Sequence, residues 1–285
     1  MASMRDIKRR RASIQSTQQI TKAMKLVSTV KLQKSRSKAE ASRPYSDMMY
    51  ATIGSMLRKS GNIDHKYLRP SGSKRKAVIA ITSNRGLAGG YNSSIVKLLA
   101  GSSETPAEDT WIYAIGRKGR DGLVRKGYKI QRDYSDVINE PMYRDAADLT
   151  VELLDEFSRG EIGEIYLAYT SFKNTVVHIP KLIKLLPVEM DLSAEESNTL
   201  LMNYEPNEDE VLSAIIPKYM SSLIYGALLE AVASENGARM TAMDSATSNA
   251  EEMIDSLSLQ YNRARQDSIT QELTEICLLY TSRCV

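Results

Sequence analysis

The chain has 285 residues, of which 42% are hydrophobic and 26% charged, with a formal net charge of +3. This length can bury a sizeable core in one or two domains, and the nearly balanced charge excludes a polycation. Only 6% of the residues are aromatic, which favours helix-rich packing over a β-sandwich or barrel. No apolar run reaches the roughly 18 to 20 residues of a membrane span, so we expect no direct span.

Metal ligands and disulfide partners are scarce. The two cysteines, Cys277 and Cys284, lie at the end of the chain, and the two histidines, His65 and His178, are far apart and near no acidic cluster. Neither a disulfide framework nor a metal-binding knuckle can be built from these residues, which favours a reducing compartment. We therefore expect no metal and no cofactor.

Residues 1–59 are predicted to form one long helix. No glycine precedes Gly54 and no proline precedes Pro44. Apolar side chains recur at steps of three, four or seven residues, opposite a strongly basic face. The predicted stripe consists of Ile7, Ile14, Thr17, Ile20, Met24, Val27 and Val30.

Residues 74–190 change to a pattern of strands alternating with helices. "KAVIAITS", "TWIYAIG" and "EIYLAYTSF" are short apolar runs, and "NSSIVKLLA" and "YRDAADLTVELLDEF" between them are helix-like. This alternation predicts a mostly parallel sheet with right-handed crossovers. The later run "TVVHIPKLIKLLPV" is expected at an edge of the sheet, because its prolines cannot donate to a β-ladder. Residues 191–207 are predicted to be a polar linker.

Residues 208–285 are dominated by a second long helix. Asn207 and Glu210 have the spacing of a capping box, and Pro217 is expected to kink or restart the helix. Beyond it the helical pattern continues to about residue 276, with a seam of mostly small side chains at alternating steps of three and four. The predicted seam is Ile224, Ala227, Ala231, Ser234, Ala238, Thr241, Ser245 and Ser248.

The two long helices flank the strand-rich segment, so each is the natural partner of the other. We predict an α/β fold with a long antiparallel α-helical coiled coil. The coiled coil is formed by residues 1–59 and 208–285, and a Rossmann-like α/β domain, residues 74–190, is inserted between its two helices.

The loop "SNRGLAGGYN" follows a predicted strand and precedes a predicted helix, where phosphate groups are often bound. Its glycines, Gly86, Gly89 and Gly90, match neither the Walker pattern, which needs a following Lys-Ser/Thr, nor the dinucleotide fingerprint. We interpret the loop as a structural turn whose glycines supply positive φ and close backbone approach. A nucleotide-binding α/β enzyme that uses this loop, with Arg85 as anion partner, stays the alternative.

A third class is a nucleic-acid-binding coiled coil, because Arg9, Arg10 and Arg11 belong to a basic run that opens the first helix. A basic face that is solvated or faces a protein is the more economical interpretation. No catalytic constellation emerges, since neither histidine lies in a triad-like context.

Two stretches at opposite ends of the chain carry a specific resemblance. They are "ASIQSTQQITKAMKLVSTVKLQK" and "ENGARMTAMDSATSNAEEMIDSLSLQYNRARQDSITQELTEI". Together with "SNRGLAGGYN" they closely resemble the gamma subunits of F-type ATP synthases, over nearly the whole chain. The resemblance implies a non-catalytic rotor shaft that couples ion flow to conformational cycling of the catalytic beta subunits. It also implies alpha and beta subunits, an epsilon subunit and a c-subunit ring as partners, and a peripheral location on the cytoplasmic face of a bacterial membrane.

The resemblance also implies partner-binding residues. In "ITKAMKLVS", Met24 matches a position close to a beta-subunit loop, with Lys22 and Lys25 beside it, and Arg239 in "ARMTAM" matches a position tied to that contact. In "NRARQDSITQE", the matching polar positions are Arg265, Gln266, Thr270 and Glu272.

The chain departs from the family pattern in two places. Asn84 and Ala88 stand where the family commonly has Asp and Cys, which weakens any catalytic role for the glycine loop. The end "CLLYTSRCV" differs from the small residues that are usual there, so we hypothesise that residues 277–285 are not a homologous end.

Overall fold

The computed structural model describes residues 4–59, 65–69, 71–188, 205 and 207–282, so the predicted linker lies almost entirely outside the described residues. The chain divides into two compact units. We call residues 1–28 with 240–285 the coiled-coil unit and residues 29–239 the α/β unit. The elements are α1 (Met4–Lys59), β1 (Lys76–Ile81), α2 (Tyr91–Gly101), β2 (Thr110–Ile115), α3 (Arg117–Val124), β3 (Lys129–Asp133), η1 (Val137–Asn139), α4 (Tyr143–Ser158), β4 (Glu164–Phe172), β5 (His178–Leu186) and α5 (Glu208–Ser282).

The α/β unit is built on one sheet with strand order β3-β2-β1-β4-β5. Strands β3, β2, β1 and β4 are parallel, and β5 joins antiparallel to β4 at the edge, as its prolines predicted. The mostly parallel sheet is therefore confirmed. The pattern did not predict β3 or α3, because the run "KIQRD" of β3 is largely polar and only partly buried at the opposite edge.

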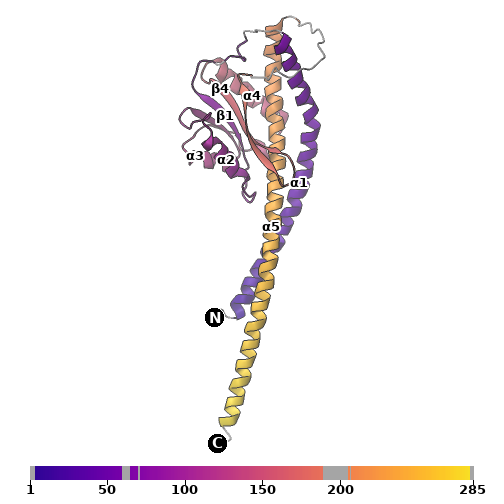
Figure 1. The fold of residues 1–285 in the computed structure, drawn as a ribbon, viewed down its shortest axis with the longest axis vertical. Helices are drawn as coiled ribbons and strands as arrows, with labels where there is room; N and C mark the ends of the chain where they lie inside the picture. The colour runs from indigo at the N-terminus through magenta and orange to yellow at the C-terminus, as the bar shows by residue number, and fades with distance from the viewer. Residues whose placement is uncertain (1–3, 60–64, 70, 189–204, 206, 283–285) are drawn as a thin grey trace. The chain divides into compact units, whose positions relative to one another are not determined.

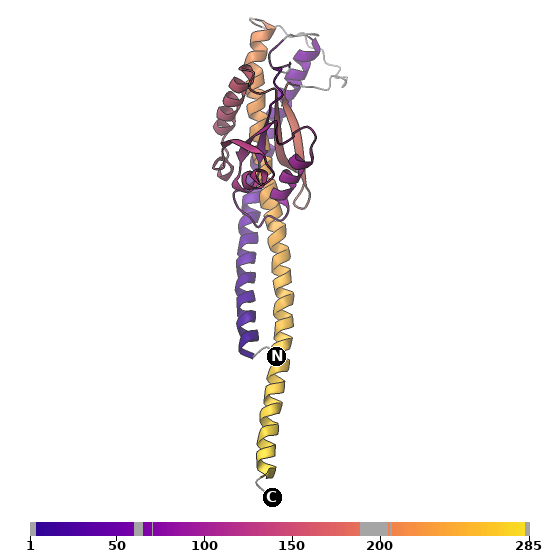
Figure 2. The same ribbon diagram turned by 90° about the vertical axis from the view of Figure 1, so that its left-hand side faces the viewer.

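Alternate side chains of the central strands enter two separate cores. Val78 and Ala80 of β1 face α2 and α3, in a cluster with Ile95 and Leu123. On the other face, a larger cluster contains side chains of β1, β2 and β4 together with those of α4 and the first part of α5. Figure 1 and Figure 2 show α4 and α5 along one side of the sheet and α2 and α3 along the other. The result is a three-layer α/β/α arrangement.

The first part of α5 is a core helix. Leu212, Ile216, Met220 and Ile224 are fully buried against the sheet. Within Asp209–Leu278, one 18-residue window has a mean hydropathy of 1.3, which by length and composition alone would suit a membrane span, and 50% of that window is buried inside the protein. The prediction that no apolar run approaches a span is therefore wrong by composition, and the physical reason is that this apolar stretch covers the sheet. The helix also continues through Pro217 without a restart.

The two long helices run antiparallel, as predicted. In the coiled-coil unit, Gln18 Nε2 donates to Glu251 Oε1 at 2.9 Å, and Lys25 Nζ lies 2.5 Å from Asp244 Oδ1. As the residue number rises on α1 it falls by the same amount on α5. Inside the α/β unit, the hydroxyls of Ser46 and Ser222 are 2.9 Å apart, which follows the same register. Figure 1 and Figure 2 show the two helices side by side along this pairing.

The seam between the helices differs from the predicted stripe. On α1, Thr21 and Ser28 are buried, whereas the predicted Ile20 and Val27 are 58% and 56% exposed. Thr21 and Ser28 each lie one residue after the predicted position, a rotation of about 100° around the helix. Ile7 of the predicted stripe is buried as expected, and Ile14 and Met24 are partly buried. Thr17 and Val30 of the predicted stripe are also exposed.

The predicted seam on α5 is buried in its first half, at Ile224, Ala227, Ala231 and Ser234, and shifted further along the helix. Met243, Thr247 and Ala250 are buried, whereas the predicted Ser245 and Ser248 are exposed. The hydroxyls of Thr21 and Thr247 meet across the seam at 2.8 Å. Two small hydroxyl side chains bonded in this way allow the backbones to approach closely, at the cost of less buried apolar area.

Candidate functional site

The outward face of the coiled-coil unit carries large apolar side chains. On α1, Ile20, Leu26 and Val27 are all more than half exposed, and on α5 the same holds for Met253 and Leu259. An amphipathic helix pair in isolation buries such residues and exposes its small polar ones. Here the buried residues include Thr21, Ser28 and Thr247 beside the apolar Ile7, Met243 and Leu257, while other large apolar side chains face outward. Exposed apolar surface of this kind marks a binding surface.

The three predicted contact residues of α1 lie in different surroundings. Lys22 is exposed, and Met24 and Lys25 are partly buried. The ammonium of Lys25 is paired with Asp244 of α5 across the seam, so its charge is already engaged within the unit. Lys22 is therefore the most accessible of the three side chains.

The four predicted polar positions of α5 are all exposed. Arg11 stacks over the ring of Tyr261, with its guanidinium carbon 5.8 Å from the ring centroid, so α1 still lies beside α5 shortly before these positions. The four positions are Arg265, Gln266, Thr270 and Glu272.

Arg239 does not lie on such a surface. It belongs to the α/β unit, and only 11% of its side chain is exposed. Its Nη2 lies 2.6 Å from Glu235 Oε1 and donates to the carbonyl oxygen of Gly86 at 3.3 Å. Its guanidinium is thus engaged inside the α/β unit, and its tie to the partner contact stays a prediction.

The glycine loop follows β1 and leads into α2, as predicted, but its glycines have different roles. Gly89 has a φ of +54°, whereas Gly90 caps α2 with a φ of −83°. Leu87 adopts a φ of +63° without being glycine. Added Cβ atoms at Gly86 and Gly90 would meet nothing closer than 3.9 Å. Only Gly89 needs the left-handed region, so the predicted close backbone approach is not what these glycines provide.

Asn84 fixes the start of this loop, a role that sequence reasoning missed. Its Nδ2 donates to the carbonyl oxygen of Ser135 at 2.7 Å, and its Oδ1 accepts from the backbone N–H of Arg117 at 3.0 Å. Both ends of the amide are thus used on backbone groups of neighbouring strand ends. An aspartate could accept from Arg117 but could not donate to Ser135.

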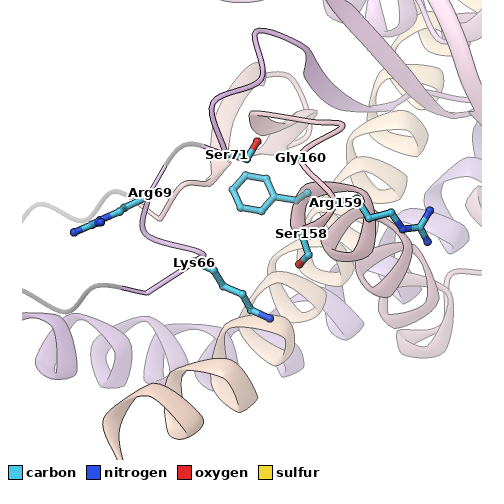
Figure 3. A pocket seen from close by; sticks show the side chains of 7 residues that line it. Lys66, Arg69, Ser71, Ser158, Arg159 and Gly160 are labelled. Atoms are coloured by element: carbon cyan, nitrogen blue, oxygen red, sulfur yellow. The ribbon is translucent and has the colours of Figure 1, made fainter.

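A cavity of about 380 Å³ lies elsewhere in the α/β unit, lined by Lys66, Arg69, Ser71, Phe157, Ser158, Arg159 and Gly160. Its cations do not converge on one point, because Arg69 and Arg159 point in opposite directions in Figure 3. Arg159 is also paired with Asp155 of the preceding helical turn. The cavity therefore lacks the converging donors of a phosphate cradle. Among the described residues, no three His, Cys, Asp or Glu side chains are grouped to hold a metal ion.

Comparison with known proteins identifies the family. A family model described as ATP synthase matches residues 3–278. A protein from Lachnoclostridium phytofermentans named ATP synthase gamma chain is 64% identical over 284 residues, which cover 97% of each chain. The chain belongs to the gamma chain family of ATP synthases. A relative from Acetobacterium woodii, 42% identical and covering 96% of each chain, is named ATP synthase gamma chain, sodium ion specific.

Solved structures agree with this assignment. The central stalk of the Tetrahymena thermophila mitochondrial ATP synthase matches with a TM-score of 0.60 and 26% identity, covering 80% of this chain and 99% of that one. A chain of the Euglena gracilis enzyme, 16% identical, shares the fold over 98% of this chain and 94% of its own, with a TM-score of 0.67. The gamma chain is the non-catalytic, central-stalk subunit of an F-type ATP synthase. The two alternatives, a nucleotide-binding enzyme and a nucleic-acid binder, are not favoured.

Proposed function

We propose that the coiled-coil unit turns inside a ring of alpha and beta subunits and forces the catalytic beta subunits through different nucleotide affinities. The observation that carries this proposal is the exposed apolar face of the helix pair, where Leu26 is 64% exposed. Small hydroxyl side chains such as Thr21 and Thr247 are hidden between the helices, and the large apolar Ile20 and Val27 face outward. A surrounding protein sleeve would cover these apolar side chains, while the narrow seam keeps the helix pair slim.

The polar residues of the surface give the proposed partner contact its specificity. Lys22 on α1 and four positions on α5 are exposed, namely Arg265, Gln266, Thr270 and Glu272. With Met24 they form the proposed partner-contact set. A rotating contact must form and break in each cycle, and a few charge-assisted hydrogen bonds provide specificity without a permanently adhesive surface. Lys25, which is paired with Asp244 across the seam, completes this proposed set.

Coupling requires that the shaft present different sides to different catalytic subunits. The helix pair is asymmetric, since α1 carries the exposed apolar Ile20 and Val27 and α5 carries the four exposed polar positions. Each catalytic subunit would therefore meet a different surface at each angle. A differential contact free energy of this kind is what shifts a subunit between binding states.

The α/β unit is the proposed attachment to the ion-driven part of the complex. We assign it contacts with an epsilon subunit and a c-subunit ring, and a place at the cytoplasmic face of a bacterial membrane. The solved relative from Tetrahymena is described as a central stalk with its c ring, which supports this assignment. Co-purification of the tagged chain with c-ring and epsilon subunits from solubilised membranes would test it, and recovery of the chain without either would contradict it.

Reconstitution with alpha and beta subunits tests the main proposal. The full chain should co-purify with them and raise their ATPase activity. Titration with ATP and with duplex DNA at two salt concentrations serves as a control for the alternatives. Micromolar nucleotide binding by the chain alone, or a steep loss of DNA affinity with salt, would contradict the rotor role if co-purification also failed.

A further inference from the structure

The segment of α5 from Ala231 to Arg239 makes a row of polar contacts with the rest of the α/β unit. Tyr91 Oη, at the start of α2, donates to the carbonyl oxygen of Ala231 at 3.1 Å. Ser234 Oγ donates to the carbonyl oxygen of Thr170 in β4 at 3.1 Å. Tyr91 and Ser234 are both buried, so these bonds are shielded from water.

Close packing continues the row. A Cβ added to Gly237 would lie 2.8 Å from His178 Cε1 and 3.5 Å from a ring carbon of Phe172. The hairpin that joins β4 to β5 thus rests directly on the α5 backbone. A side chain at this position would separate the helix from the sheet, which is why glycine occupies it.

Arg239 ends the row at the glycine loop. Its guanidinium bridges Glu235 on the preceding helical turn and the carbonyl oxygen of Gly86. The side chains of Arg239 and Glu235 are only 11% and 13% exposed, so both charges are largely removed from water. The fork of a guanidinium can serve a carboxylate and a carbonyl at once, which a lysine ammonium does less well.

We propose that Arg239 is a positioning residue that locks the glycine loop onto α5, so that the α/β domain and residues 208–239 of α5 turn as one body. Glu235 holds the guanidinium in place, and Arg239 holds the loop through Gly86. This inference rests on the proposed rotor function and deepens it. Torque that enters through the α/β domain must pass to α5, and the Arg239 contact lies at the end of the interface where the loop joins the helix.

The lock also explains why the glycine loop does not resemble a phosphate site, although it lies between a strand and a helix. The nearest buried cation is already neutralised by Glu235, and it binds a loop carbonyl instead of an incoming anion. The loop is thereby a mechanical element of the domain.

Hydrogen–deuterium exchange of the full chain provides the first test. In Arg239→Gln, the amides of residues 86–91 should exchange faster by on the order of tenfold or more, because one charge-assisted hydrogen bond is lost. Arg265→Gln, which removes an exposed arginine from the same helix, should leave the exchange of these amides unchanged. Unchanged exchange in Arg239→Gln would overturn the proposal.

Coupling in the reconstituted complex provides the second test. The number of ions pumped per ATP hydrolysed should fall in Arg239→Gln, by on the order of threefold, since the pair no longer transmits torque fully. Glu235→Gln should show a smaller loss of the same kind. The double variant should be no worse than Arg239→Gln, because residues that act as one unit are not additive.

The outcomes separate this lock from the rotor function itself. Failure of the unaltered chain to assemble with alpha and beta subunits would contradict the rotor role. A coupling loss in Arg239→Gln with unchanged loop exchange, or losses that add in the double variant, would instead show that Arg239 acts on a partner. Either result would overturn the lock while leaving the rotor role intact.

Discussion

Replacing Ile20 and Val27 together by serine tests whether these side chains belong to a partner-binding surface or to the core of the helix pair. Serine has nearly the helix propensity of these β-branched residues, so α1 should persist. Full burial of a valine or isoleucine side chain contributes about 1.5–3 kcal/mol. The two side chains are 58% and 56% exposed, so more than half of that gain is unrealised in the chain by itself. A sleeve that covered them fully would gain about 2 kcal/mol, equivalent to about thirtyfold in affinity.

The assay compares two quantities on the same variant. Urea unfolding of the isolated chain should lose about 1.5–2.5 kcal/mol, the part already realised by partial burial. Titration of alpha and beta subunits with the variant, followed by the rise in ATPase activity, should show affinity weakened by about thirtyfold. The matched control is Val124→Ser with Val151→Ser, two valines that are 54% and 65% exposed in the α/β unit. This control should bind the catalytic subunits like the unaltered chain.

The opposite pattern would refute the reasoning. If the double serine variant lost 3 kcal/mol or more of unfolding free energy, as a buried core pair does, and bound alpha and beta subunits normally, these side chains would belong to the seam. The outward face would then not be the binding surface. Equal weakening by the control pair would likewise remove the claim that the effect is specific to the coiled-coil unit.

Three further predictions follow from individual residues. Met24→Lys adds a charge beside Lys22 and should lower ion pumping per ATP hydrolysed in reconstituted vesicles, whereas coupling equal to that of Met24→Leu would contradict the contact. Gly116→Ala should cost about 2–4 kcal/mol of unfolding free energy in urea titration. The φ of Gly116 is +108°, and the new Cβ would lie 2.3 Å from the carbonyl oxygen of Thr82. A loss below about 0.5 kcal/mol would contradict that geometry. Burial lowers the pKa of His65 below its ordinary 6.5 despite nearby Asp209, so the folded chain favours the neutral imidazole. The contribution of His65 to stability should therefore be full above pH 6.5, the pKa of the unfolded chain, and should decline as the pH falls below that value. His65→Gln should flatten that decline between pH 7 and 5, and an unaltered pH profile would exclude His65 as its source.

The local geometry supports the pH prediction. The backbone N–H of Tyr67 donates to Nδ1 of His65 at 3.2 Å, and Nε2 lies 2.9 Å from Ser213 Oγ. A neutral ring with its proton on Nε2 satisfies both contacts. Protonation of Nδ1 would break the bond from Tyr67, which is a second reason, besides burial, for the neutral form to be favoured in the folded chain.

The sequence predicted the elements whose signals are strong and local. Three central strands stand out as continuous apolar runs because both of their faces are buried, and the prolines of "HIPKLIKLLPV" placed that run at an edge. The polar β3 and short α3 gave no such signal. The capping of α5 could also be predicted, since the backbone N–H of Glu210 donates to Asn207 Oδ1 at 2.8 Å.

The sequence by itself determined that two long helices enclose an α/β domain, because helix length, strand alternation and the absence of breakers are local properties of the chain. Only the tertiary structure decided which sides of those helices meet. Apolar periodicity selected Ile20 and Val27 for the seam, whereas packing selected Thr21 and Ser28, one residue further on. It also turned Arg239 inward onto Gly86. Periodicity reports that a helix has an apolar face, but the close approach of two backbones determines whether that face or the adjacent small-residue face is buried.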